Sequence, residues 1–211
     1  MTTIRDATEA DADFIAWAIH TAGRSHMPRS PWEFMSGRTP EQTLAFHRRV
    51  AVSDRVHMNH WSLFLIAEVD GRPAAALCGY DGDTQGPDAL LSVAADIAVE
   101  EGVVFDDAFL ERFAIIGNVA HATPPGAWVV ENVASDPEFR RRGLVRQLLQ
   151  AVLDRGRARG FTTAQVDVFI GNDSARDAYL DLGFRSVAEK RDPAFEAAMG
   201  SAGSEQLLLT L

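Results

Sequence analysis

The sequence has a single cysteine, Cys78, among 211 residues, and it has no long apolar run. One cysteine excludes an internal disulfide bond and any metal site built from several thiolates. Without about 18 consecutive apolar residues, the chain contains no candidate membrane span. The opening residues also lack the basic-then-apolar order of a signal peptide. We therefore expect a cytoplasmic protein of ordinary globular composition, since 46% of the residues are hydrophobic and 24% are charged.

Basic residues are outnumbered, with 20 Lys and Arg against 30 Asp and Glu and a net charge of −10. This balance argues against nucleic acid or an anionic membrane surface as a partner, because both attract positive charge. The charge is nevertheless uneven. Residues 136–160 carry seven Arg and only three acids. An acidic protein with one basic segment predicts a local site for an anionic ligand.

Local signals divide the chain into alternating elements without a linker or an internal repeat. Thr39-Pro40-Glu41-Gln42 is a strong helix start, and Asp70-Gly71 predicts the turn of a hairpin. The expected order is a first strand, a helix over 8–23, a loop over 25–37, a helix from 39, strands over 62–69 and 74–80, helices within 83–126, a strand over 127–134, a helix over 143–159, a strand over 163–170, a helix over 174–183, and strands over 184–189 and 206–211. The alternation predicts one α/β domain over residues 1–211, with a mixed sheet covered by helices and a helical insertion over 83–126.

One segment combines a strand, a short turn and the start of an amphipathic helix. Residues 129–134 belong to the expected strand, Pro137 marks the turn, and Arg140-Arg141-Arg142-Gly143 opens the helix. A helix start offers unpaired N–H groups and the positive end of a dipole. Gly143 permits close approach to the backbone, and the arginines add charge-assisted donors. The segment therefore predicts a pyrophosphate site, although it has neither the P-loop nor the dinucleotide-binding glycine pattern.

Arg140-Arg141-Arg142-Gly143-Leu144-Val145 resembles the main motif of the GNAT family of N-acetyltransferases, which is Arg/Gln-x-x-Gly-x-Gly/Ala at a strand-to-helix junction. Val145 stands where that motif has Gly or Ala. A second family pattern, Asn-x-x-Ala-x-x-x-Tyr-x-x-x-Gly-Phe, is matched by Asn172, Ala175, Tyr179, Gly183 and Phe184. The resemblance implies a mixed, mostly antiparallel sheet flanked by helices. The insertion, between the third and fourth strands, departs from the family, in which a short connection is usual.

The resemblance also implies acetyl-CoA as the co-substrate. The backbone at Val133, Ala134 and Ser135 would pair with the pantetheine arm as an added strand does. Asn172 would contact the pantetheine. Tyr179 would protonate the departing thiolate, unless it is only a helix aromatic packed on the sheet. The residues expected at the diphosphate are Arg140, Arg141, Arg142, Gly143, Leu144, Val145 and Arg146.

The acceptor amine must lose a proton, since a lysine-like amine has a pKa of ~10.4. Glu131, on the strand before the turn, is the candidate base; the alternative is a glutamate in a hydrogen-bond network or at the surface. Asn132 is the other candidate to face the acceptor, because strand alternation places Glu131 and Asn132 on opposite faces. Trp32 and Phe34 either line the acceptor pocket, as that region does in the family, or pack under their loop.

The insertion is strongly acidic. Residues 81–126 carry nine acids and one Arg. One interpretation is a lid over the acceptor side that favours cationic amines. The other is a pair of helices with acidic faces turned to solvent.

We therefore expect an N-acetyltransferase that transfers an acetyl group from acetyl-CoA to a primary amine by direct attack in a ternary complex. The alternatives are a non-catalytic acyl-CoA-binding sensor on the same fold, motivated by Val145 and the insertion, and a protein for another phosphate ligand. A small amine or a peptide remains open as the acceptor. No metal is expected, since His57-Met58-Asn59-His60 would need further ligands. Cys78, in an apolar strand, is expected in the core. We expect no nucleic-acid or membrane partner, and a homodimer is left open.

Overall fold

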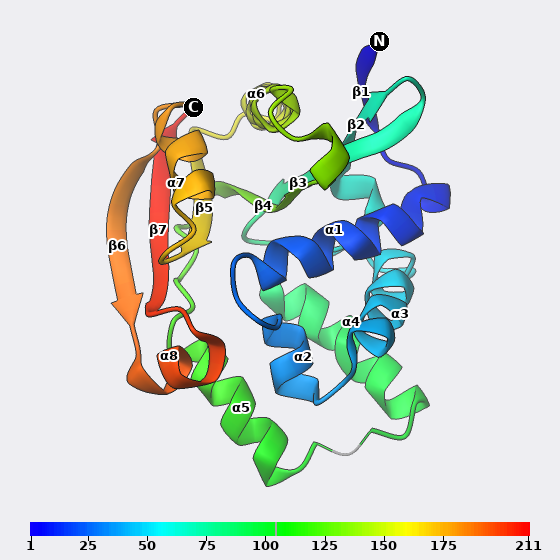
Figure 1. Ribbon diagram of the computed structural model, residues 1–211, viewed down its shortest axis with the longest axis vertical. Helices are drawn as coiled ribbons and strands as arrows, with labels where there is room; N and C mark the ends of the chain where they lie inside the picture. Colours follow the sequence, from blue (N-terminus) through cyan, green and yellow to red (C-terminus); the bar gives the residue numbers. More distant parts are fainter. Residues whose placement is uncertain (104) are drawn as a thin grey trace.

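A seven-stranded mixed sheet organises the chain in the computed structural model, which describes residues 1–103 and 105–211 (Figure 1). The strand order is β1-β2-β3-β4-β5-β7-β6. Among the described strands, only β4 and β5 pair in parallel, and all other neighbours are antiparallel. The strands are β1 (Thr2–Asp6), β2 (Phe64–Val69), β3 (Arg72–Asp81), β4 (Ala127–Ser135), β5 (Thr163–Phe169), β6 (Arg185–Arg191) and β7 (Gly203–Thr210). The prediction of a mixed, mostly antiparallel sheet is confirmed.

Helices cover both faces of this sheet. In the described part of the chain, no helix has the length and apolar character needed to cross a membrane. The α-helices are α1 (Ala12–Arg24), α2 (Pro31–Ser36), α3 (Pro40–Ala51), α4 (Pro87–Glu100), α5 (Asp107–Gly117), α6 (Leu144–Ala158), α7 (Asp173–Leu180) and α8 (Pro193–Met199). Short 3-10 turns are η1 (Glu9–Asp11), η2 (Trp61–Leu63) and η3 (Pro137–Phe139). The expected helical insertion between the third and fourth strands is present as α4 and α5; Val104, which falls between them, lies outside the described residues.

The segment predicted as a loop over residues 25–37 contains a helix, α2, so that prediction is wrong. Ser30 caps the helix by accepting from the Glu33 N–H at 3.2 Å, and the Glu33 carboxylate accepts from the Ser30 N–H. Pro31 occupies the first turn, and Gly37 ends the helix with φ +67°. Ser30-Pro31-Trp32-Glu33 is thus the same capping signal as the one recognised at Thr39-Pro40.

A second unpredicted helix, α8, interrupts the connection between β6 and β7. The Asp192 side chain accepts from the Phe195 N–H at 2.7 Å, and Pro193 starts the helix. Phe195 and Met199 are fully buried. They pack with Met27 and Val119, so the loop after α1, the insertion and α8 meet in one cluster.

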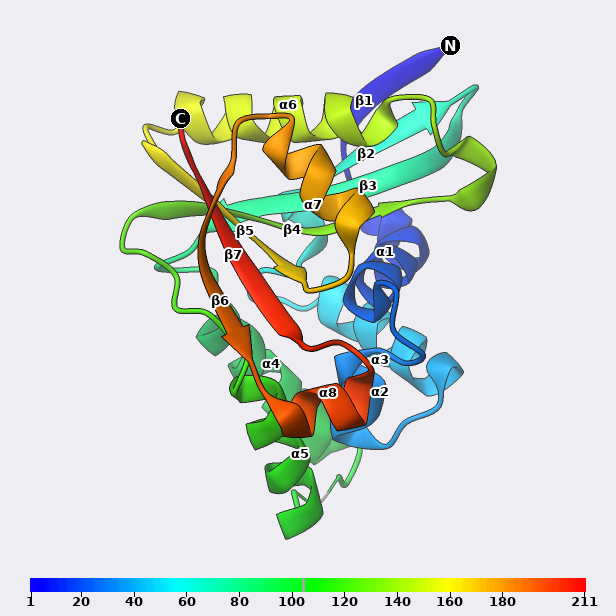
Figure 2. The same cartoon turned by 60° about the vertical axis from the view of Figure 1, so that its left-hand side comes forward.

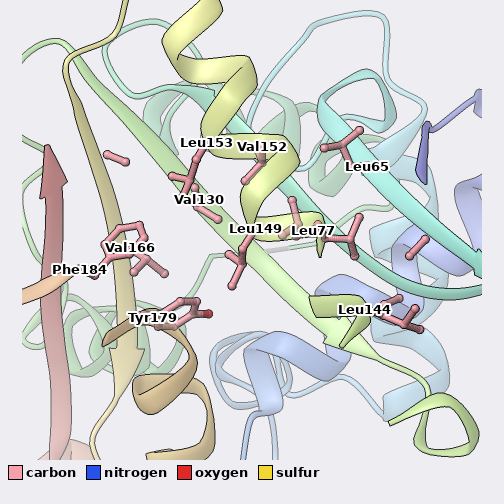
Figure 3. Close-up of a cluster of buried hydrophobic side chains, with 14 of the residues drawn as sticks. Leu65, Leu77, Val130, Leu144, Leu149, Val152, Leu153, Val166, Tyr179 and Phe184 are labelled. Atoms are coloured by element: carbon pink, nitrogen blue, oxygen red, sulfur yellow. The ribbon is translucent and has the colours of Figure 1, made fainter. Parts of the chain in front are cut away.

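Two cores lie on the two faces of the sheet. The larger one is packed between the sheet and α6 and includes Leu77, Val130, Leu149 and Val166 (Figure 3). The other lies beneath α1, which rests against β3 and β4 on the opposite side (Figure 2). Because each strand alternates its side chains, β3 and β4 supply both cores.

The parallel pair β4–β5 separates after a short contact. Its register runs over three pairs only, from Ala127 opposite Thr163 to Val129 opposite Gln165. Beyond these pairs β4 continues to Ser135 and β5 to Phe169, in diverging directions (Figure 1). We call this divergence the β4–β5 fork. It leaves the edge of β4 beyond Val129 without a strand partner among the described residues.

Candidate functional site

A bulge in β4 shapes one arm of the fork. Cys78 pairs with Glu131 and Ala76 pairs with Ala134, so Leu77 of β3 faces two residues of β4, Asn132 and Val133. Asn132 takes up the extra residue with φ +56°. Asparagine adopts this left-handed conformation more readily than most residues do. Bulges of this kind change which way side chains point.

The bulge overturns the prediction that Glu131 and Asn132 lie on opposite faces. The Asn132 amide donates to Asn59 Oδ1 at 2.9 Å and to Cys78 Sγ at 3.4 Å. Glu131 faces Tyr80, which belongs to the same α1-side core as Cys78. Both side chains are therefore directed to the α1 side, because the extra residue breaks the two-residue alternation. Cys78 itself is fully buried, as expected.

The start of α6 presents a run of free amides. Gly143 precedes the helix with φ +72°, and Arg141 has φ +61°. The Gln147 amide bonds to the Gly143 carbonyl at 3.1 Å. Over residues 1–103 and 105–211, no acceptor is found for the amides of residues 141–146. These free N–H groups form a hydrogen-bond-donor surface, which we call the donor surface, of a kind that binds phosphate groups.

Four arginines surround these amides and carry no ion pair within the described chain, and their side chains are exposed. They are Arg140, Arg141, Arg142 and Arg146. By contrast, Arg155 pairs with Asp6. The unneutralised charge of residues 136–160 is thus concentrated at the helix start, where an anion gains most from it.

Val145 does not point at this donor surface. It is partly buried and packs against the core between α6 and the sheet, next to fully buried Leu148. The branched side chain at the position where the family motif has Gly or Ala therefore lies on the inner side of the helix.

Two carboxylates lie on the α1 side of the fork, one on each arm. Burial raises the pKa of Glu131 to about 8, repulsion by Asp167 on β5 adds to this rise, and the Tyr80 hydroxyl partly offsets it. Burial also raises the pKa of Asp167, while the Gln165 amide, 3.1 Å from both carboxylate oxygens, opposes the rise. A paired carboxylate site with raised pKa values can accept a proton near neutral pH.

Tyr179 lies on α7, next to β5 and Phe184 (Figure 3). Its side chain is 5% exposed, and the two rings meet at 61° with their centroids 6.0 Å apart. The hydroxyl is on the side of the ring away from Phe184 (Figure 3). Burial, with a smaller effect from Glu131, raises the pKa of Tyr179, so the phenol stays protonated.

Asn172 caps α7 and ties it to the loop after α1. Its Oδ1 accepts from the Ala175 N–H at 3.3 Å, and its Nδ2 donates to Ser25 Oγ at 2.7 Å. Ser25 has φ +53°. The Asn172 side chain thus fixes the orientation of the helix that carries Tyr179, and its contact with pantetheine stays a prediction.

Trp32 and Phe34 lie in different clusters. Trp32 stands edge-on to His47, with ring centroids 5.3 Å apart, in the helical layer of α2 and α3. Phe34 packs beside Met27 and stacks under the Arg29 guanidinium, 4.5 Å from its ring centre. Phe34 thus lies near the C-terminal end of β5, whereas Trp32 packs toward α3. Their role in acceptor binding stays a prediction.

The acids at the C-terminal end of α4 are engaged with the α3 region. Arg49 pairs with Glu100 and Glu101, and Arg55 pairs with Asp96. This arrangement supports neither a free acidic lid nor a bare solvent face for α4. The insertion approaches the fork with its last residues instead, where His121 Nε2 is 3.2 Å from the Ser204 carbonyl.

Asp167, Gln165 and Tyr80 are site residues that sequence reasoning missed. Asp167 is the one charge inside the β-branched strand Gln165-Val166-Asp167-Val168, which was the available signal. Asp167 lies close to Glu131 because of the fork, and the spacing of the two residues along the chain does not indicate this proximity.

Comparison with known proteins identifies the family of the chain. The model of the acetyltransferase (GNAT) family matches residues 26–184. The chain belongs to the GNAT family. The match includes the free amides of α6, both carboxylates of the fork and Tyr179. It ends at Phe184, so β6, α8 and β7 are placed by the structure alone.

Relatives of this GNAT chain resemble it over a short stretch. The [ribosomal protein bS18]-alanine N-acetyltransferase of Salmonella typhimurium is 39% identical over 61 residues, which are 29% of this chain and 41% of that protein. The chain thus spans about two fifths of that relative's length.

Solved structures resemble it over its whole length. An N-acetyltransferase from Staphylococcus aureus Mu50 has a TM-score of 0.66 at 17% identity, covering 98% of this chain and 100% of that one. The Salmonella typhimurium protein yncA, solved with acetyl-CoA, has a TM-score of 0.54 at 16% identity, covering 100% and 94%. At these identities the likeness concerns the fold.

Proposed function

We propose that the protein transfers the acetyl group of acetyl-CoA to a primary amine by direct attack in a ternary complex. One observation carries this proposal: the β4–β5 fork has a surface of free backbone amides at α6 and a carboxylate pair with raised pKa values on its α1 side. A thioester that passes through the fork would be attacked by an amine that approaches from the α1 side, where the two carboxylates lie.

The chain offers a continuous surface for acetyl-CoA, the donor of the acetyl group. The amides of residues 141–146 would bind the diphosphate, with Arg140 and Arg146 neutralising its charge. The unpaired edge of β4 at Val133, Ala134 and Ser135 would bond to the amides of the pantetheine arm. The side chain of Val145 leaves the donor surface clear, which removes one of the two reasons for the non-catalytic alternative.

The carboxylate pair would receive the proton of the acceptor. The pKa of Glu131, about 8, matches that of an α-amino group, ~7.7–8.0, better than that of a lysine, ~10.4. Proton transfer between groups of similar pKa is nearly balanced. We therefore favour an α-amine, such as a peptide amino terminus, and the alanine-specific name of the Salmonella relative points in the same direction.

Tyr179 would complete the transfer. As the amine nitrogen bonds to the carbonyl carbon, the C–S bond breaks and the thiolate needs a proton. A buried, protonated phenol beside the fork can give it.

The two tyrosines of the chain provide the test, with thiol release from acetyl-CoA and a peptide beginning with alanine as the assay. Tyr179→Phe should lower kcat about a hundredfold across the pH range while acetyl-CoA still binds. Tyr80→Phe should instead move the pH profile to higher pH, since the Tyr80 hydroxyl lowers the pKa of Glu131. Acetyl-CoA binding by the unaltered protein without thiol release for any amine would establish the non-catalytic alternative.

A further inference from the structure

Helix α5 has an apolar outer face that no other described part of the chain covers. None of its residues is buried, and Leu110 and Phe113 are 54% and 39% exposed. Phe105, just before the helix, is 42% exposed, and its ring meets that of Phe109 at 4.9 Å. A helix that is apolar on both sides is normally covered on both sides. We call Phe105, Leu110 and Phe113 the α5 outer face.

The inner side of α5 is firmly attached. Ile115 and Ile116 pack against the cluster of Met27 and Phe195, and the Arg112 Nε donates to the Met35 carbonyl at 3.0 Å. Rotation of the helix to hide its outer face would break these contacts. The exposure of the outer face is therefore a fixed property of the fold.

The charges beside the outer face indicate what it binds. Asp106, Asp107 and Glu111 are exposed there, and none has an ion-pair partner in the part of the chain that the structure describes. At the C-terminal end of α4, in contrast, Asp96, Glu100 and Glu101 are neutralised by Arg49 and Arg55. An apolar strip edged by unneutralised acids fits a partner with both basic and apolar side chains. Two copies of this chain meeting at this face would bring like charges together.

The position of α5 indicates which basic partner this is. α6 and α5 lie at opposite ends of the molecule in both views (Figures 1 and 2). The donor surface is at α6, so α5 lies at the end of the molecule away from the expected co-substrate. The cluster under α5 also contains Phe169, two residues after Asp167 on β5. α5 therefore lies next to the end of the fork arm that carries Asp167.

We propose that the α5 outer face docks a basic, partly apolar segment of the polypeptide whose amine is acetylated. This inference rests on the proposed function and adds that the acceptor is a polypeptide rather than a small amine. α5, with eleven residues, is about 16 Å long, which about five residues of extended chain would cover.

Binding is tested directly, without turnover. The probe is a fluorescent peptide of about twelve residues that begins with alanine and alternates lysine with leucine, and the measurement is its anisotropy with the full chain. The double variant Leu110→Ser/Phe113→Ser should weaken binding about tenfold, and Asp107→Lys/Glu111→Lys should do the same and remove its salt dependence. Leu91→Ser, at an exposed site on α4, is the control and should change nothing.

Turnover separates this inference from the proposed function. The outer-face variants should raise KM for the long peptide and leave its kcat and the kinetics of trialanine unchanged. Equal peptide binding by the parent chain and the Ser variant would overturn the docking proposal, whatever the activity. The docking proposal would also be overturned if the parent chain sediments as a dimer and the Ser variant sediments as a monomer. Absence of acetylation of any amine, with peptide binding still sensitive to the variants, would overturn the proposed function and leave the docking face established.

Discussion

Replacing Glu131 with glutamine should remove one specific limb of the pH–rate profile. Burial and the repulsion of Asp167 raise the pKa of Glu131 to about 8. A group with this pKa is ionised in about one molecule in eleven at pH 7 and in about ten in eleven at pH 9. If the ionised carboxylate accepts the proton of the amine, its contribution to kcat/KM should rise about tenfold across this interval.

The assay must separate this titration from that of the acceptor, because an α-amine has a pKa of ~7.7–8.0. Thiol release is therefore measured for the parent chain and Glu131→Gln with the same alanine peptide. The amine contributes equally to both profiles, so their ratio isolates Glu131. Glu138→Gln, at an exposed glutamate paired with Arg72, is the control and should keep the parent profile. A ratio that stays constant from about pH 7 to pH 9 would refute the role of Glu131 as the base.

Stability provides a second measurement on the same variant. The pKa of Glu131 in the folded protein lies above its ordinary value of 4.5. The folded state therefore holds this proton more tightly than the unfolded state does, and stability falls as pH rises from 4.5 toward 8. Glutamine has no proton to lose, so Glu131→Gln should be stabilised relative to the parent increasingly over this range in urea unfolding. A constant difference would show that Glu131 titrates normally.

Three further predictions concern the partner carboxylate, the donor surface and the helical layer. Asp167→Asn removes a like charge and should lower the pKa of Glu131, moving the rising limb of kcat/KM to lower pH; an unmoved limb would show that the two do not interact. Arg146→Glu should weaken acetyl-CoA binding in calorimetry about tenfold, whereas Arg157→Glu, at the far end of α6, should not; equal effects would contradict the donor surface. Burial lowers the pKa of His47 to about 3, so stability should fall by about 2 kcal/mol between pH 6.5 and pH 5 as the unfolded chain takes up the proton. His47→Phe should flatten this decline in urea unfolding, and a parent chain equally stable at both pH values would refute it.

The fold was largely predictable because its signals are local. The helix start at Thr39-Pro40, the turn at Asp70-Gly71 and the alternation after Ala127 depend on residues close together in the chain. α2 was missed although Ser30 and Glu33 carry the same capping signal. α8 was missed because its seven residues show too little periodicity to distinguish a helix from a turn.

The candidate site was predictable at the start of α6 and only partly at the carboxylate pair. The donor surface is a strand, a turn and a helix start within one segment, so the sequence alone determined Gly143 and the arginines around it. The orientation of Asn132 depends on a bulge that exists only when β4 pairs with β3. The meeting of Glu131 with Asp167, and the raised pKa values that result, require two strands to pair at Gln165 and then diverge. The orientation of Asn132 and the raised pKa values are set by long-range strand pairing and burial. Neither can be predicted from the spacing of residues along the chain.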